Sequence, residues 1–161
     1  MIQRAVLFLV IFSTSRALGQ QNGSAFDRQA YYQAMSLDKL NLINEQLDKL
    51  NTASIPGKDA YEGAMTMKKA GLNGNPDKKL RLFKSGHRKL EAAIHRDSNN
   101  VEFRFLRLMI QEHAPGVLGY KGSLKTDSDY IHRSYKTLSK ELQVIILDYS
   151  KKSKILKLGD S

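Results

Sequence analysis

Apolar residues recur three and four positions apart along nearly the whole chain, which is the period of one face of an α-helix. Alternation at a period of two, which marks a β-strand, does not extend over any useful length. The sequence therefore predicts an all-α protein built of stacked antiparallel helix hairpins. With 161 residues, of which 41% are hydrophobic, the chain is long enough for one such domain with its own core.

Capping residues, prolines and glycines divide this pattern into six expected helices. The first five are expected at 25–35, 37–50, 58–72, 76–95 and 101–113. Ser24 and Ser36 are suited to cap the first two, and Asn75 followed by Pro76 is suited to begin the fourth. An irregular loop is expected at 117–126.

The sixth helix is predicted from a regular apolar seam, with Asp127 or Ser128 as its N-cap. The steps along this seam are four and three residues, through Ile131, Tyr135, Leu138, Leu142, Ile145 and Tyr149. Such a seam either docks onto its own domain or pairs with a second chain as a coiled coil. It covers less than about three heptads, which favours docking.

The N-terminus has the layout of a secretory signal peptide. Arg4 supplies the positive start, an apolar run follows at 5–12, and Ala17 and Gly19 are the small residues before a cut at Gln20. The run is far shorter than the roughly 20 residues that span a bilayer. A cut after Ala17 and a buried N-terminal helix are the alternatives.

The expected organisation is therefore a signal peptide at 1–19, a tail at 20–24, a single helical domain at 25–158 and a tail at 159–161. A processed chain of this kind is expected to be soluble outside the cytoplasm, either secreted or periplasmic. No transmembrane segment is expected, because no later stretch is long and apolar enough.

Small and bulky residues follow one another at a fixed spacing in the fourth expected helix. Gly86 is followed by Leu90 four residues later and by Ala93 three residues further on, and a turn at 97–100 comes next. This arrangement resembles the second helix of a tetratricopeptide repeat. Small residues in such a helix let a neighbouring helix approach closely.

The resemblance covers about 35 residues well and about 90 when it is extended to the neighbouring helix pairs. Gly86 stands where the family usually has Ala, Ser98 where it has Pro, and Arg104 where it has a large aromatic residue. The resemblance implies a short α-solenoid-like array and a scaffold that presents a groove to a protein partner. It implies no catalytic residue.

Histidine is the side chain best suited to acid–base chemistry near neutral pH. His87, Glu91 and His95 follow at intervals of four and are expected to face solvent. The two imidazoles lie about 12 Å apart along the helix, too far to share a metal ion without a second helix. His113 is expected to satisfy carbonyls at a helix end, and His132 has no neighbour of interest.

Recognisable catalytic patterns are missing from the sequence. It has no Cys, no HExxH or GxSxG motif and no phosphate-cradling glycine loop. We therefore expect a protein that is not an enzyme, with no metal and no cofactor. The enzyme alternative would need a pocket that joins a His to Arg104 or Arg107.

Positive charge is concentrated in the second half of the chain. The net charge is +10, or +8 once Arg4 and Arg16 leave with the signal peptide, and residues 20–75 are balanced. Lys78, Arg81 and Arg88 are candidate contacts for an anionic partner. A merely solubilising surface is the alternative for these side chains.

Arg104 and Arg107 lie three residues apart in an otherwise apolar run, so their stems are expected to be partly buried. A buried guanidinium needs a carboxylate or several carbonyls. The two arginines therefore either brace a neighbouring helix or the loop at 115–120, or face a groove and clamp an anionic group.

These observations predict an exported, non-enzymatic helical binding or scaffold protein that contacts an acidic protein partner through its groove and its basic second half. The alternative is a binder of anionic lipid headgroups or glycan at the envelope surface. No nucleic-acid partner is expected, because export separates the chain from the genome.

Overall fold

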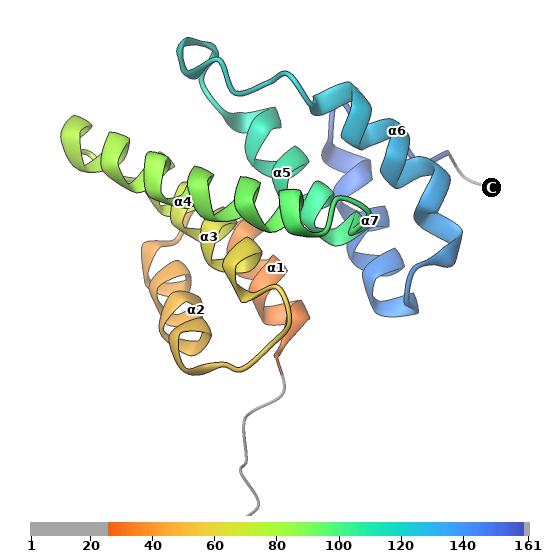
Figure 1. Cartoon of the computed structure of the whole chain (residues 1–161), viewed down its shortest axis with the longest axis horizontal. Helices are drawn as coiled ribbons and strands as arrows, with labels where there is room; N and C mark the ends of the chain where they lie inside the picture. The colour runs from red at the N-terminus through yellow and green to blue at the C-terminus, as the bar shows by residue number, and fades with distance from the viewer. Residues whose placement is uncertain (1–25, 160–161) are drawn as a thin grey trace, which may run out of the picture.

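The computed structural model describes residues 26–159 and contains helices and no strand there, which confirms the predicted fold class (Figure 1). The expected signal peptide, its Gly19–Gln20 cleavage point and the tail at 20–24 lie outside the described residues. The helices are α1 (Arg28–Ser36), α2 (Leu40–Thr52), α3 (Lys58–Gly71), α4 (Pro76–Arg96), α5 (Val101–His113), α6 (Leu124–Ser134) and α7 (Lys140–Lys152), with 3-10 turns η1 (Gly116–Leu118) and η2 (Tyr135–Thr137).

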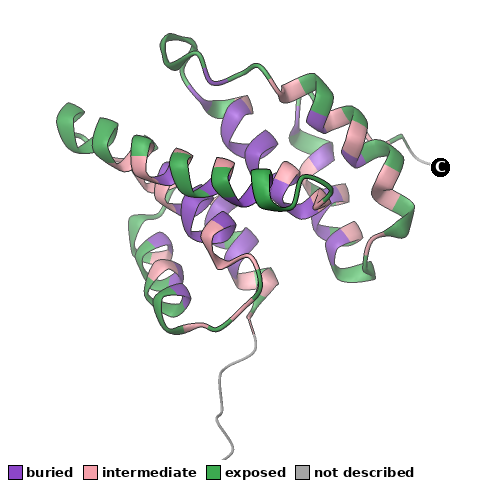
Figure 2. Cartoon of the chain, viewed as in Figure 1, coloured by how far each residue is buried: buried purple, intermediate pink, exposed green. Residues whose placement is uncertain are grey.

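Helices that follow one another in the chain pack as neighbours. The pairs α1–α2, α3–α4 and α5–α6 are in contact, and α3 also contacts α2 and α5. Buried residues from all of these helices form one core, in which α5 is covered on nearly every side (Figure 2). Within the part of the chain that the structure describes, no helix has both the length and the apolar character to cross a membrane.

The middle three helices agree with the prediction to within one residue at each end. Helix α3 ends at Gly71, α4 continues to Arg96, and α5 has the expected bounds. Asn75 caps α4 as expected, because its side-chain oxygen accepts a hydrogen bond from the backbone N–H of Lys78 at 2.9 Å.

The predicted starts of the first two helices are wrong. Asp27 is the N-cap of α1, three residues later than the expected cap. Ser36 does not begin α2 but ends α1, and its hydroxyl donates to the Gln33 carbonyl at 2.9 Å. Helix α2 begins only at Leu40, after an extended Leu37, so Leu37 leaves the apolar face on which the spacing had placed it.

The prediction of a single last helix is also wrong, because the seam is divided between two helices that meet at a corner. Helix α6 begins at Leu124, inside the expected loop, and α7 begins after Ser139, whose hydroxyl caps it. The side-chain amide of Gln143 donates to the Leu138 carbonyl at 2.8 Å and closes the corner. The coiled-coil alternative therefore loses the continuous ridge that it needs.

The corner lets two parts of the seam pack against the core from different directions. Ile131 on α6 is fully buried, and the seam residues Leu142 and Ile145 on α7 are also buried. Helix α6 contacts α5 directly, and Tyr149 of α7 meets Phe105 of α5 edge-on, with ring centroids 5.3 Å apart. On a straight helix, all the seam residues would pack against a single neighbour.

Helices α3 and α4 approach each other closely at two glycines. A methyl group on Gly86 would lie 2.5 Å from the carbonyl oxygen of Gly63 and 2.8 Å from Cγ of Met67. A methyl group on Gly63 would lie 2.7 Å from the Gly86 carbonyl oxygen. Gly86, Leu90 and Ala93, the residues that carry the small–bulky–small spacing, are all buried on α4.

After α7, the chain is held against the body by Glu112. The carboxylate of Glu112 accepts hydrogen bonds from the hydroxyls of Tyr149 and Ser153, both at 2.7 Å, and from the backbone N–H of Lys154. Burial alone raises the pKa of Glu112, but these hydrogen bonds outweigh it and hold the pKa below its ordinary value. Leu156, fully buried, anchors the segment further.

We predict that Gly86→Ala destabilises the protein by about 1–3 kcal/mol, because the new methyl group forces the two backbones apart. The measurement is the free energy of unfolding from denaturant titration followed by circular dichroism. Gly71→Ala is the matched control, since open space surrounds Gly71. A Gly86→Ala variant as stable as the wild type would contradict the close contact.

The Glu112 contact predicts a loss of stability in acid. Because the folded-state pKa of Glu112 is depressed, its contribution is fully present above the unfolded-state pKa of about 4.5 and is lost as the pH falls through the folded-state pKa. Thermal unfolding between pH 7 and pH 3 should therefore fall less steeply for Glu112→Gln than for the wild type. Parallel pH curves for the two proteins would argue against this assignment.

Candidate functional site

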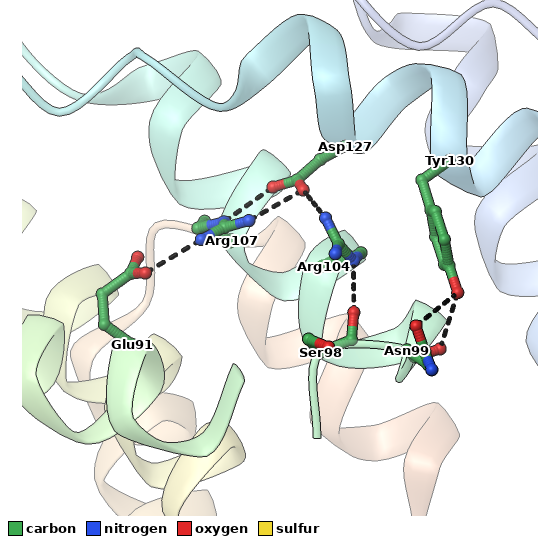
Figure 3. A network of polar contacts seen from close by, with 7 residues as sticks. All are labelled: Glu91, Ser98, Asn99, Arg104, Arg107, Asp127 and Tyr130. Atoms are coloured by element: carbon green, nitrogen blue, oxygen red, sulfur yellow. Dashed lines mark hydrogen bonds and ion pairs between the residues drawn. The ribbon is translucent and has the colours of Figure 1, made fainter. Parts of the chain in front are cut away.

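The two arginines that the sequence singled out meet one buried carboxylate. Asp127 of α6 is completely buried, and it accepts hydrogen bonds from Nε and Nη2 of Arg107 at 2.7 and 2.8 Å and from Nη1 of Arg104 at 3.0 Å (Figure 3). The Asp127–Arg107 contact is a bidentate ion pair, which is the strong form of this interaction. It joins α5 to α6.

Each of the two arginines also donates to a second partner. Arg107 donates from Nη1 to Glu91 of α4 at 2.9 Å. Arg104 donates from Nε to the Ser98 carbonyl at 2.8 Å, and its guanidinium lies 4.4 Å from the centroid of the Tyr130 ring. Burial alone lowers the pKa of Arg107, but the hydrogen bonds and charges of Asp127 and Glu91 raise it above its ordinary value, so the group stays charged.

This network balances two cations with two carboxylates, Asp127 and Glu91. Arg104 and Arg107 therefore act as an internal brace, which was the first of the two alternatives that their spacing left open. A clamp for an anionic ligand would need donors that no protein carboxylate occupies. The network instead fixes α4, α5 and α6 relative to one another.

The loop after α5 closes over one side of α4. The Tyr120 ring meets those of His87 and Phe83, with centroids 4.6 and 5.6 Å apart, and its hydroxyl donates to Glu91. The prediction that His87 and Glu91 face open solvent is therefore wrong, since both are only half-exposed, whereas His95 is exposed. Among residues 26–159, no cluster of side chains suitable for holding a metal ion is found.

His113 behaves as its position indicated. Its Nδ1 lies 3.0 Å from the carbonyl oxygen of Met109 in the last turn of α5. The ring thus contacts a backbone carbonyl in the last turn of its own helix, as expected for a polar side chain at a helix end.

The basic residues of α4 are placed quite differently from the two arginines of α5. Lys78, Arg81, Lys84 and Arg88 are all exposed, and none forms an ion pair with another described residue. We call these four residues the cationic stripe. Arg81, Lys84 and Arg88 are spaced so that they share the side of α4 opposite the buried Gly86 and Leu90.

The cationic stripe occupies the part of α4 that reaches to the edge of the molecule (Figure 1). Residues 76–81 are exposed throughout, and the only acidic residue in the first fourteen positions of the helix is Asp77. Unpaired like charges on one helix repel one another, so the stripe favours an anionic partner. Three of the four stripe residues were predicted from the sequence as contacts for an anionic partner. Lys84 was not among them.

A separate pocket of about 480 Å³ opens at the other end of α4. It is lined by Phe26, Arg28, Ile55, Pro56, Gly57, Tyr61, Ala93, Arg96, Asp97, Asn100, Glu102 and Phe103. Both of its arginines are paired: Arg28 donates to Glu102 at 2.9 Å, and Arg96 donates to Asp59 at 2.6 Å. This pocket therefore has an aromatic lining but offers no free cation.

Comparison of the chain with protein families, curated proteins and solved structures finds no match. The function is therefore inferred from the geometry of the described residues. That geometry separates a neutral brace inside the molecule from an unneutralised stripe on its surface.

We predict that Asp127→Asn destabilises the protein by about 3–5 kcal/mol, because it leaves two partly buried guanidinium groups without their carboxylate. Denaturant unfolding measures the effect. Asp129→Asn is the control, since Asp129 is a solvent-exposed carboxylate on the same helix. Equal stability of the two variants would mean that Asp127 is not the centre of the brace.

Proposed function

We propose that the chain is a non-enzymatic helical binding module that holds an anionic partner through the cationic stripe of α4. The single observation that carries the proposal is the contrast between the α4 cations and the α5 arginines. Arg104 and Arg107 are neutralised inside the molecule, whereas the stripe residues are exposed and form no ion pair with another described residue.

The same contrast argues against the enzyme alternative. It required a pocket joining a histidine to Arg104 or Arg107, and both guanidinium groups are occupied by Asp127. The 480 Å³ pocket is lined by neither of these arginines and by no histidine. Binding rather than catalysis is thus the function that the described side chains support.

An acidic protein is one candidate partner. Stacked helix hairpins offer a rigid surface for a partner chain, and the resemblance of the α4 segment to a tetratricopeptide repeat favours a scaffold. Anionic lipid headgroups or glycan are the other candidate, because two exposed apolar side chains of η1, Val117 and Leu118, come just before Tyr120, whose ring packs against His87 of α4. We further propose that the protein is exported, secreted or periplasmic, on the N-terminal signal pattern.

The test is a pull-down from an envelope extract of the source organism, with washes at low and then high salt. We expect the triple variant Arg81→Glu, Lys84→Glu, Arg88→Glu to recover the partner about tenfold less well, because three exposed charge pairs become repulsive. The matched control reverses three cations near the C-terminus, in Lys152→Glu, Lys154→Glu, Lys157→Glu. Equal recovery by the wild type and the α4 variant would overturn the proposed binding surface.

The salt wash separates the two candidate partners. A stoichiometric protein that remains bound at high salt indicates an interface with a buried apolar part, as expected for a scaffold. Release of all bound material at high salt, with lipid or glycan in the eluate, indicates adsorption to an anionic surface.

A further inference from the structure

The loop at η1 projects apolar side chains into solvent. Val117 is 93% exposed and Leu118 is 37% exposed, and they stand between Gly116 and Gly119. Gly119 has a φ of 61°, a left-handed conformation that glycine adopts without strain, so the loop turns sharply directly after its two apolar residues. A side chain exposed to this degree contributes nothing to the core of its own molecule.

The exposed tip is tied to the helix that carries the cationic stripe. Tyr120 directly follows the loop, packs against His87 of α4 and donates its hydroxyl to Glu91. Leu80, 44% exposed, lies on the side of α4 that His87 shares, next to the side that carries Lys84. The apolar tip is therefore joined to α4 on the side next to Lys84.

We infer that this region docks the protein on an anionic lipid bilayer. The inference rests on the proposed function, because it uses the same cationic stripe and names its partner. Arg81, Lys84 and Arg88 contact the headgroups, while Val117 and Leu118 enter the boundary between the headgroups and the acyl chains.

Shape and charge together favour a bilayer over a protein partner. A partner protein would need a pocket matched to the protruding tip, whereas a bilayer deforms around any small apolar group. The 480 Å³ pocket lies at the opposite end of α4, away from the cationic stripe. Cations beside an apolar tip have the composition of interfacial membrane-binding surfaces.

The experiment measures co-sedimentation of the purified protein, its N-terminus determined by mass spectrometry, with vesicles. One set of vesicles is phosphatidylcholine alone, and the other contains about one third phosphatidylglycerol, which supplies the negative surface potential. We expect binding to the second set only. Reversal of Arg81, Lys84 and Arg88 to Glu should weaken it about a hundredfold, at about fivefold for each cation.

The apolar tip is tested separately by the double variant Val117→Asp, Leu118→Asp, which should weaken binding by about tenfold or more because the tip no longer enters the interface. The matched control is Val144→Asp, Ile155→Asp, which changes two other exposed apolar residues, 59% and 40% exposed, and should bind as the wild type does. Circular dichroism establishes that each variant is folded.

The C-terminal segment is a second control surface, because it also combines exposed cations with an exposed apolar residue. Lys152, Lys154 and Lys157 are exposed there beside Ile155. If their reversal to Glu abolishes vesicle binding while the α4 variant still binds, the inference is overturned. It is also overturned if both vesicle types bind equally, or if the Asp variants of the tip bind like the wild type.

Failure of this inference is distinguishable from failure of the proposed function. If no vesicle binds but the pull-down recovers a protein that requires Arg81, Lys84 and Arg88, the stripe is a binding surface for an acidic protein and the bilayer inference is wrong. If neither vesicles nor any extract component depends on the stripe, both proposals are wrong.

Discussion

The buried carboxylate of Asp127 is the interaction on which the arrangement of the second half of the chain depends. A fully buried carboxylate is stable only when it is paired, and Arg104 and Arg107 provide three hydrogen bonds to it. Arg107 extends the contact to Glu91 of α4, to which Tyr120 also donates. One charged cluster thereby sets the positions of α4, α5, α6 and the loop that carries η1.

The contact between α3 and α4 decides which side of α4 is available to a partner. Gly63 and Gly86 bring the two backbones so close that neither position has room for a methyl group, and this directs Leu90 into the core. Arg81, Lys84 and Arg88 then face away from the body, where no described carboxylate reaches them. The surface proposed for binding is therefore the outer side of α4, rather than the groove that a helical array suggests from sequence.

Local signals predicted the parts of the fold whose causes are local. Asn75 and Pro76 define the start of α4, and α3 and α5 end within a residue of their expected limits, because caps and breakers act over one helical turn. The corner at Ser139 was not predicted, because a seam with unbroken three- and four-residue steps indicates a single continuous helix. Only the burial of Ile131 and Ile146 on two sides of the core favours the break.

The helical class and the limits of α3, α4 and α5 follow from the order of residues in the chain, because caps, breakers and apolar spacing act between near neighbours. The order of residues does not decide which cations are free. Arg107 and Asp127 are 20 residues apart, and nothing in their spacing distinguishes this pair from other combinations of basic and acidic residues. Only the packing of α4, α5 and α6 neutralises Arg104 and Arg107 and leaves the stripe on α4 exposed, since pairing of charges distant in sequence requires the folded chain.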